Sequence, residues 1–376
     1  MRILLICEAF RSIGGVQEVV DNLAAELSAA GHRVAILSTA FVAGPQRSIR
    51  FEGECRYLEI PSRRSLGLRH LERLLWSGSS SEIRKLVRTI AEFGPQLVSS
   101  HCWSWDRFPT VADVCAQAGV PWVHTLYDSW GIGKMGPGAL SSLNHARALT
   151  ALSEATRQYF EPVLPNVRQA RVIMGGVDVQ SAAAAPAHSH SRPYVLCAAR
   201  LDLRHKALDS LVSAFALASR EHQDVDLLIS GDGPDRAILE EFANSCGLAD
   251  RVKFLGIVSR TELWSLYKGA LLFAMPSRMP EGLGLTFLEA MASGLAVVGT
   301  RSGGTPEIVK QGVTGLLVEH NLPDELSSAI SSLIKDRGRA IAMGARGRSM
   351  AVRCYGWPRF AERYSELYAS CLGESS

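Results

Sequence analysis

The feature that most restricts the fold of this chain is a glycine-rich turn between two apolar runs. The runs, 270–275 and 295–298, have the length and composition of buried strands. Gly282 and Gly284 lie in the turn, and good helix formers follow over 285–291. This strand–turn–helix–strand order predicts a parallel α/β sheet. A turn of this kind presents backbone N–H groups and the positive end of a helix dipole, which suits a phosphate.

Two acidic residues flank this turn. Glu281 and Glu289 are eight positions apart, which corresponds to about 12 Å along a helix. This is close to the length of a sugar nucleotide, whose phosphates lie in the middle and whose hydroxyls lie at both ends. Because carboxylates accept hydrogen bonds from hydroxyls, we predict a nucleotide-sugar site. In the alternative, Glu281 is a solvated loop residue and Glu289 a charge on a helix surface, but the glycine-rich turn between them argues against it.

Length and composition predict an ordinary globular protein of two domains. The chain has 376 residues, of which 47% are hydrophobic and 20% charged, and its net charge of +3 gives no reason to expect a nucleic acid partner. We find neither a signal peptide nor a membrane span. Cys7 and Cys197 lie in strand-like runs, so we expect reduced, buried thiols and a cytoplasmic location.

The amino-terminal half opens with a second β–turn–α unit. A strand over 2–7 leads through Gly14 and Gly15 into a helix over 17–30, without the G-x-G-x-x-G fingerprint of dinucleotide sites. From residues alone, the two glycines are best interpreted as a tight turn. The domain organisation that we predict is 1–180 for an amino-terminal Rossmann-like domain, 181–192 for an Ala/Ser/His/Pro-rich linker without periodicity, 193–354 for a carboxyl-terminal Rossmann-like domain, and 355–376 for a final amphipathic helix.

Polar residues follow two strands of the first domain. His101 comes after the strand 96–100, and Tyr127 and Asp128 follow the strand 120–126. Because the carboxyl ends of parallel strands face ligands, we predict that these three side chains line the acceptor side of a cleft. His124 lies inside its strand and is better interpreted as a core residue with a hydrogen-bond partner.

A basic, leucine-rich stretch, 63–76, carries four arginines. It is compatible with an amphipathic helix in weak contact with a membrane or with a surface for an anionic acceptor. A solvated helix on the first domain is the interpretation that we favour.

Two cations follow the first strand of the second domain. Arg200 and Lys206 lie on the loop after the strand 194–199, where they can reach one anion together. Two solvated cations would be the ordinary interpretation of such a pair. The D-x-D at 224–226 comes before its strand, away from the ligand-binding edge, so we do not interpret it as a metal site.

The segment 280–309, PEGLGLTFLEAMASGLAVVGTRSGGTPEIV, resembles the donor-site signature of the retaining glycosyltransferases of family 4. Its first element matches E-G-x-G-x-x-x-x-E-A-x-A-x-G-x-P-V, except that Ala296 replaces proline, and Gly303, Gly304 and Glu307 match the G-G-x-x-E element that follows. Gly175 replaces the asparagine of I-x-N-G-V-D. Tyr127 occupies the position where the family has a histidine near the reacting sugar. This departure weakens the expectation that a histidine lies in the cleft of this protein.

The resemblance implies the GT-B fold, an α/β architecture with two Rossmann-like domains facing each other across a cleft. It also implies roles for individual residues: Arg200 and Lys206 neutralise the departing diphosphate, and Glu281 and Glu289 hold the transferred sugar and the ribose. The remaining donor contacts that it implies are Gly14, Gly15, Gly231, Ile257 beside the base, Gly282, Leu283, Gly284 and Leu285.

The implied reaction is transfer of a sugar from a nucleoside-diphosphate sugar to a hydroxyl group of a glycan, a lipid-linked saccharide or a small metabolite, with retention and without cofactor or metal. Uridine is the base that we favour, and guanosine is possible. The alternatives are an epimerase or phosphorylase on the same fold and a sugar-nucleotide binding protein without activity. Such a binding protein would be expected to lack Arg200, Lys206 or Glu281, and all three are present.

Overall fold

The chain is organised as two α/β units. The computed structural model describes residues 1–7, 15–38, 50–52, 55–59, 86, 89–101, 108–127 and 137–373. Unit 1 comprises residues 1–174 and 357–376, and unit 2 comprises residues 175–356. Gly14, Asp128 and the basic stretch 63–76 therefore lie outside the described residues.

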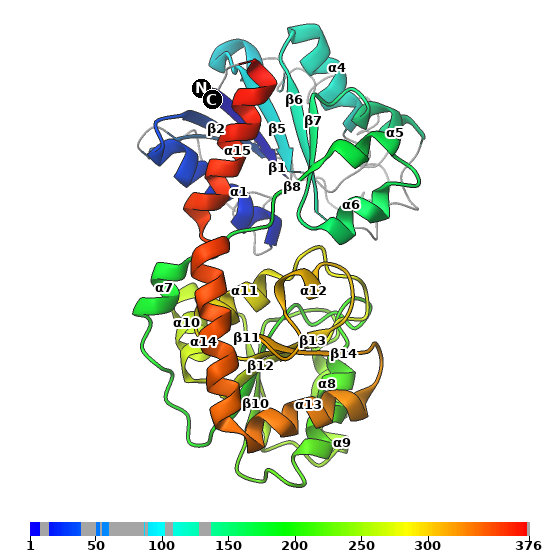
Figure 1. Ribbon diagram of the computed structural model, residues 1–376, viewed down its shortest axis with the longest axis vertical. Helices are drawn as coiled ribbons and strands as arrows, with labels where there is room; N and C mark the ends of the chain where they lie inside the picture. Colours follow the sequence, from blue (N-terminus) through cyan, green and yellow to red (C-terminus); the bar gives the residue numbers. More distant parts are fainter. Residues whose placement is uncertain are drawn as a thin grey trace, which may run out of the picture. The chain divides into compact units, whose positions relative to one another are not determined.

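Unit 1 contains a sheet of strand order β3-β4-β2-β1-β5-β6-β7-β8, in which only the β3–β4 pair is antiparallel. Its strands are β1 (Arg2–Cys7), β2 (Arg33–Ser38), β3 (Arg50–Glu52), β4 (Cys55–Glu59), β5 (Leu97–His101), β6 (Trp122–Leu126), β7 (Ala148–Ala151) and β8 (Arg171–Val172). The central strands β1, β5 and β6 are buried along almost their whole length because helices cover both faces of the sheet (Figure 1). Cys7 is buried, as predicted.

The described helical segments of unit 1 are α1 (Gly15–Ala29), α4 (Phe108–Ala118), α5 (Pro137–Leu143), α6 (Glu154–Phe160), the 3₁₀ segment η3 (Pro165–Gln169) and α15 (Trp357–Leu372). The last of these comes from the far end of the chain and packs against α1 (Figure 1). Its buried residues recur at helical spacing, among them Phe360, Tyr364 and Tyr368. The two tyrosine hydroxyls form buried hydrogen bonds with the sheet, at 2.9 Å to Thr125 and 2.8 Å to Ser99.

Unit 2 contains a parallel sheet of strand order β11-β10-β9-β12-β13-β14. Its strands are β9 (Tyr194–Ala198), β10 (Asp226–Ser230), β11 (Val252–Gly256), β12 (Leu272–Met275), β13 (Val297–Thr300) and β14 (Gly315–Val318). The chain order reverses beside β9 and β12, and their carboxyl ends are where ligands bind in sheets of this type. Cys197 in β9 is a free, buried thiol, as predicted.

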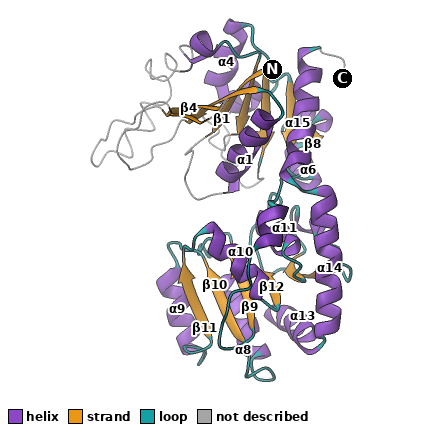
Figure 2. Ribbon diagram, turned by 90° about the vertical axis from the view of Figure 1, so that its left-hand side faces the viewer, coloured by secondary structure: helices purple, strands orange, loops and turns teal. Residues whose placement is uncertain are grey.

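Helices cover the sheet of unit 2 on both faces (Figure 2). The helices of unit 2 are α7 (Val179–Ala184), α8 (Leu208–Ala218), α9 (Arg236–Ser245), α10 (Arg260–Gly269), α11 (Leu285–Ala292), α12 (Thr305–Ile308), α13 (Pro323–Lys335) and α14 (Arg337–Cys354). Among the helices in the described parts of the chain, none combines the length and apolar composition that crossing a bilayer requires.

The segment predicted as an irregular linker, 181–192, is part of unit 2. It begins inside α7, whose first turn is capped by Asp178. Further on, His188 N donates to Ser265 O at 2.9 Å, and His190 Nε2 lies 2.9 Å from the buried carboxylate of Asp226. Beyond α7, residues 185–192 form neither helix nor strand, and these hydrogen bonds to residues distant in sequence attach them to unit 2.

Candidate functional site

Lys206 and Glu281 form an ion pair at the carboxyl edge of the unit 2 sheet. Lys206 Nζ donates to Glu281 Oε1, and the side chains are 18% and 16% exposed. Ser277 Oγ donates to the same carboxylate oxygen. A lysine ammonium has three donor hydrogens, so Lys206 can bind an anion while it remains bonded to Glu281.

Main-chain contacts between two loops bring this pair together. The loops follow the neighbouring strands β9 and β12, so both start at the same edge of the sheet. Lys206 and Ser277 form an isolated antiparallel bridge, and Ala207 N donates to Pro276 O at 3.2 Å. The predicted proximity of Lys206 to the turn around Glu281 therefore rests on backbone hydrogen bonds as well as on charge.

Arg278 fixes the two loops further. Its Nη2 lies 3.0 Å and 2.8 Å from the two carboxylate oxygens of Asp209, and its Nη1 donates to Leu203 O at 2.5 Å. Hydrogen bonds with a charged donor and acceptor are stronger than neutral ones, so these contacts hold the loop of Arg278 to that of Leu203. No sequence pattern points to this residue, because an arginine after a strand does not identify its distant partner.

Arg200 differs from Lys206 in its surroundings. Its side chain is exposed and has no hydrogen bond or ion pair within the described residues, although its charge helps to lower the pKa of Asp202. Burial acts to raise that pKa, but hydrogen bonds from His205 and from the Arg204 N–H outweigh it. The Arg200 guanidinium can therefore bind an anion without first breaking a contact within the described residues. Its role in binding diphosphate stays a prediction.

The glycine-rich turn leads into α11 as predicted. Gly284 has a left-handed conformation with φ 87° and is the N-cap of the helix, and no side chain caps that end. Backbone N–H groups in the first turn of an uncapped helix are donors for an anion. Gly282, Leu283 and Leu285 belong to the same turn, and Leu283 is buried. Whether the N–H groups of this turn bind phosphate stays a prediction.

Glu289 is buried within α11, so the alternative that it is a charge on a helix surface was wrong. The residue is 4% exposed. Arg260 Nη1 donates to its Oε1 at 2.7 Å, and the Tyr267 hydroxyl donates to its Oε2 at 2.8 Å. Arg260 also lies over the ring of Trp264, 5.0 Å from the centroid. A carboxylate has about four acceptor positions, so two remain for the predicted bonds to ribose.

The glycine pair after β13 packs against the backbone of Glu281. Gly304 N donates to Glu281 O at 2.8 Å. Gly303 has φ 57°, and a Cβ atom there would lie 2.6 Å from Glu281 N and nearer still to Glu281 O. The G-G-x-x-E element therefore supports the loop that carries Glu281. Glu307 is in the short helix α12.

The other predicted donor residues differ in what surrounds them. Gly231 allows close packing of two loops, because a Cβ atom there would lie 2.9 Å from the Ala199 carbonyl carbon and closer to its oxygen. Ile257 follows β11 and is 60% exposed, which leaves an apolar surface at this edge. Gly15 is the first residue of α1 and is exposed.

His101 is not at an open edge of unit 1, which corrects the prediction that it faces an acceptor. The side chain is fully buried, and burial lowers its pKa to about 3. Its Nε2 lies 3.1 Å from Ser99 Oγ and its Nδ1 lies 2.8 Å from the Tyr127 hydroxyl. Tyr127 is also buried, at 7% exposure. The prediction did not take account of α15, whose Tyr368 bonds to Ser99 from the other end of the chain.

His124 is a core residue, as predicted. It is fully buried, and its Nδ1 lies 2.8 Å from Ser100 Oγ. Within the part of the chain that the structure describes, no three His, Cys, Asp or Glu side chains are grouped as they would be around a metal ion.

Comparison with protein families and curated proteins gives matches over both units. Residues 13–181 match the family described as Glycosyltransferase Family 4, and residues 178–350 match Glycosyl transferases group 1. One relative, the GDP-mannose-dependent alpha-(1-6)-phosphatidylinositol monomannoside mannosyltransferase of Mycobacterium tuberculosis, is 40% identical over 182 residues. That match spans about half of each chain, 47% in both.

A longer match is to the GDP-mannose-dependent monoacylated alpha-(1-6)-phosphatidylinositol monomannoside mannosyltransferase of Corynebacterium glutamicum. It is 31% identical over 282 residues, which are 69% of this chain and 73% of the relative.

Solved structures share the fold along the whole chain. Sucrose-phosphate synthase from Thermosynechococcus elongatus has a TM-score of 0.84 at 23% identity and covers 100% of both chains. Anabaena HepE in complex with UDP and glucose has a TM-score of 0.77 at 20% identity, covering 98% of this chain and 100% of that one. The two-domain α/β architecture is therefore the GT-B fold, as predicted. Together with the family matches and the long relative, it shows that this chain belongs to glycosyltransferase family 4.

Proposed function

We propose that this protein is a retaining glycosyltransferase that transfers mannose from GDP-mannose to a hydroxyl group of a phosphoinositide-type acceptor. The Lys206–Glu281 pair, held beside the amino terminus of α11, is the observation that carries the proposal. It combines a cation and helix N–H groups for a diphosphate with a carboxylate for sugar hydroxyls. The guanosine donor and the acceptor come from the names of the sequence relatives, which favour GDP-mannose over the uridine donor expected from the sequence.

In the proposed reaction, the bond between the sugar C1 and the leaving phosphate oxygen breaks while the acceptor oxygen bonds to C1 on the same face. The acceptor proton passes to a phosphate oxygen of the departing GDP. Lys206, Arg200 and the first N–H groups of α11 stabilise the negative charge that develops on that diphosphate. Glu281 binds the hydroxyls of the transferred sugar, and Glu289 binds the ribose.

A panel of sugar nucleotides tests the donor directly. We expect GDP-mannose and GDP to raise the melting temperature, since a ligand that binds only the folded state stabilises it by RT ln(1 + [L]/Kd). UDP-glucose at the same concentration should give a smaller shift. GDP release on adding a phosphoinositide acceptor separates a transferase from a protein that only binds sugar nucleotides. A larger shift with UDP-sugars would reject the guanosine donor, and GDP-mannose binding without GDP release would reject the transferase.

We predict that Arg260→Gln raises the KM for the donor about tenfold or more and changes kcat less. Arg260 holds the carboxylate of Glu289 in the orientation that ribose would meet, and hydrogen bonds to charged groups contribute about 1.5–3 kcal/mol. The measurement is initial rate against donor concentration.

Arg192→Gln is the matched control. Arg192 is also about half exposed and also pairs with a buried carboxylate, that of Asp226, at the opposite end of the sheet. Its KM should stay at the value of the unmodified protein. Equal KM values for both variants would contradict a role for the Arg260–Glu289 pair in donor binding.

A further inference from the structure

Helix α14 carries an unusual concentration of positive charge. Over Arg337–Cys354 it contains five arginines and no acidic residue. The helix is anchored by its small residues: a Cβ atom on Gly347 would lie 3.2 Å from Met291 of α11, and Gly344 packs against the backbone at Gly294. Because this packing fixes which side of α14 is buried, the opposite side is a stable surface of unit 2.

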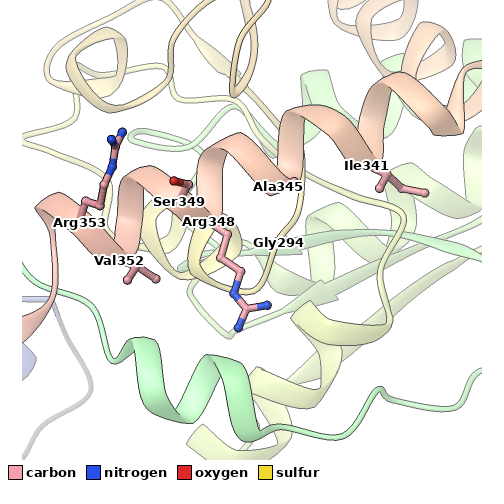
Figure 3. A pocket seen from close by; sticks show the side chains of 7 residues that line it. All are labelled: Gly294, Ile341, Ala345, Arg348, Ser349, Val352 and Arg353. Carbon is pink, nitrogen blue, oxygen red and sulfur yellow. The ribbon is translucent and has the colours of Figure 1, made fainter.

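That opposite side has an apolar centre. Ile341 is 71% exposed and Val352 is 52% exposed, and with Ala345 they occupy one face of the helix at spacings of four and seven residues. These side chains line a shallow hollow of about 500 Å³ together with Gly294, Arg348, Ser349 and Arg353. Figure 3 shows Ile341, Val352 and Arg348 projecting from one side of the helix and Arg353 from the other edge.

The arrangement has arginines along both edges of an apolar strip. Helical geometry places Arg337 and Arg348 on one edge and Arg346 and Arg353 on the other. Strips of this kind bury their apolar side chains at the boundary between headgroups and acyl chains, while long cationic side chains reach the phosphates. An anionic bilayer offers an apolar interior to Ile341 and Val352 and phosphate groups to the arginines. A nucleic acid backbone would contact the arginines but leave Ile341 and Val352 in water.

We propose that the exposed face of α14, centred on Ile341, Val352, Arg348 and Arg353, docks on the surface of a membrane that contains anionic phospholipids. The surface is separate from the candidate donor site, so the proposal does not depend on the proposed function. It is also independent of the stretch 63–76, which lies outside the described residues. Each arginine near an anionic surface strengthens binding by about fivefold.

The test is co-sedimentation of the full chain with vesicles of phosphatidylcholine alone or with about a third of phosphatidylinositol added. We expect binding only to the anionic vesicles. Arg348→Gln/Arg353→Gln should weaken it by about 25-fold, and Ile341→Ser/Val352→Ser by at least about fivefold. The charge-matched control is Arg168→Gln/Arg220→Gln, which removes two exposed arginines elsewhere and should bind as the unmodified protein does.

Melting temperature and the thermal shift given by GDP-mannose should be the same in all these proteins, which separates failure of docking from failure of the donor site. Unchanged vesicle binding by both α14 variants would overturn the proposal, because another surface would then account for it. Absence of binding by the unmodified protein, or equal weakening in the control, would overturn it as well.

Discussion

Replacing Lys206 by alanine should lower turnover by at least about 10²-fold while the protein stays folded. Lys206 is the cation that the structure holds against Glu281, and a fixed charge that stabilises a leaving group commonly contributes about 10²- to 10³-fold in rate. Its side chain is only 18% exposed, so few water molecules can approach the position that its charge occupies. GDP release at saturating donor and acceptor measures the effect, and the melting temperature reports the fold.

Lys335→Ala is the control for this variant. Lys335 pairs with Glu221 on the surface of unit 2, where the two side chains are 60% and 59% exposed. Exposed pairs contribute little, so both turnover and stability should stay close to those of the unmodified protein. If Lys206→Ala turned over at a rate similar to that of Lys335→Ala, Lys206 would have no part in catalysis.

Much of the second domain follows from its sequence because local patterns and topology agree there. Apolar runs separated by glycine turns and helix formers predict β12, α11 and β13, and the parallel arrangement then brings the loop of Lys206 beside that of Glu281. Burial of Glu289 was harder to predict, since its partners Arg260 and Tyr267 come from the preceding helix. The same limit applies to Arg278 and Asp209, whose pairing depends on how two loops meet in space.

In the first domain, the rule that strand ends face ligands gave a wrong position for His101. The rule holds only where nothing else covers that end of the sheet. Tyr364 and Tyr368 of α15 bring hydroxyl groups into the same buried region, so His101 is part of a polar network instead of an open edge. Periodicity alone predicts that α15 has a buried face, but not which residues this face will cover.

Gly303→Ala should be the other strongly damaging substitution, although Gly303 carries no functional group. An L-residue in the left-handed region costs about 1–2 kcal/mol, and forcing extra atoms into a packed site costs about 1–3 kcal/mol more. We therefore expect a loss of about 2–5 kcal/mol in the free energy of unfolding, measured by urea denaturation. In the protein that remains folded, the backbone of Glu281 has to shift, and a displacement of about 1 Å in a catalytic group can lower the rate about 10²-fold.

Gly312→Ala separates these two effects. Gly312 has φ 72°, and a Cβ atom there would have no heavy atom within 4 Å, so alanine introduces backbone strain without overlap. This control should lose about 1–2 kcal/mol of stability and keep its turnover. Equal stability and equal turnover in the two variants would mean that Gly303 only permits a turn. A selective loss of turnover in Gly303→Ala would show that the second glycine element acts by holding the main chain of Glu281 in place.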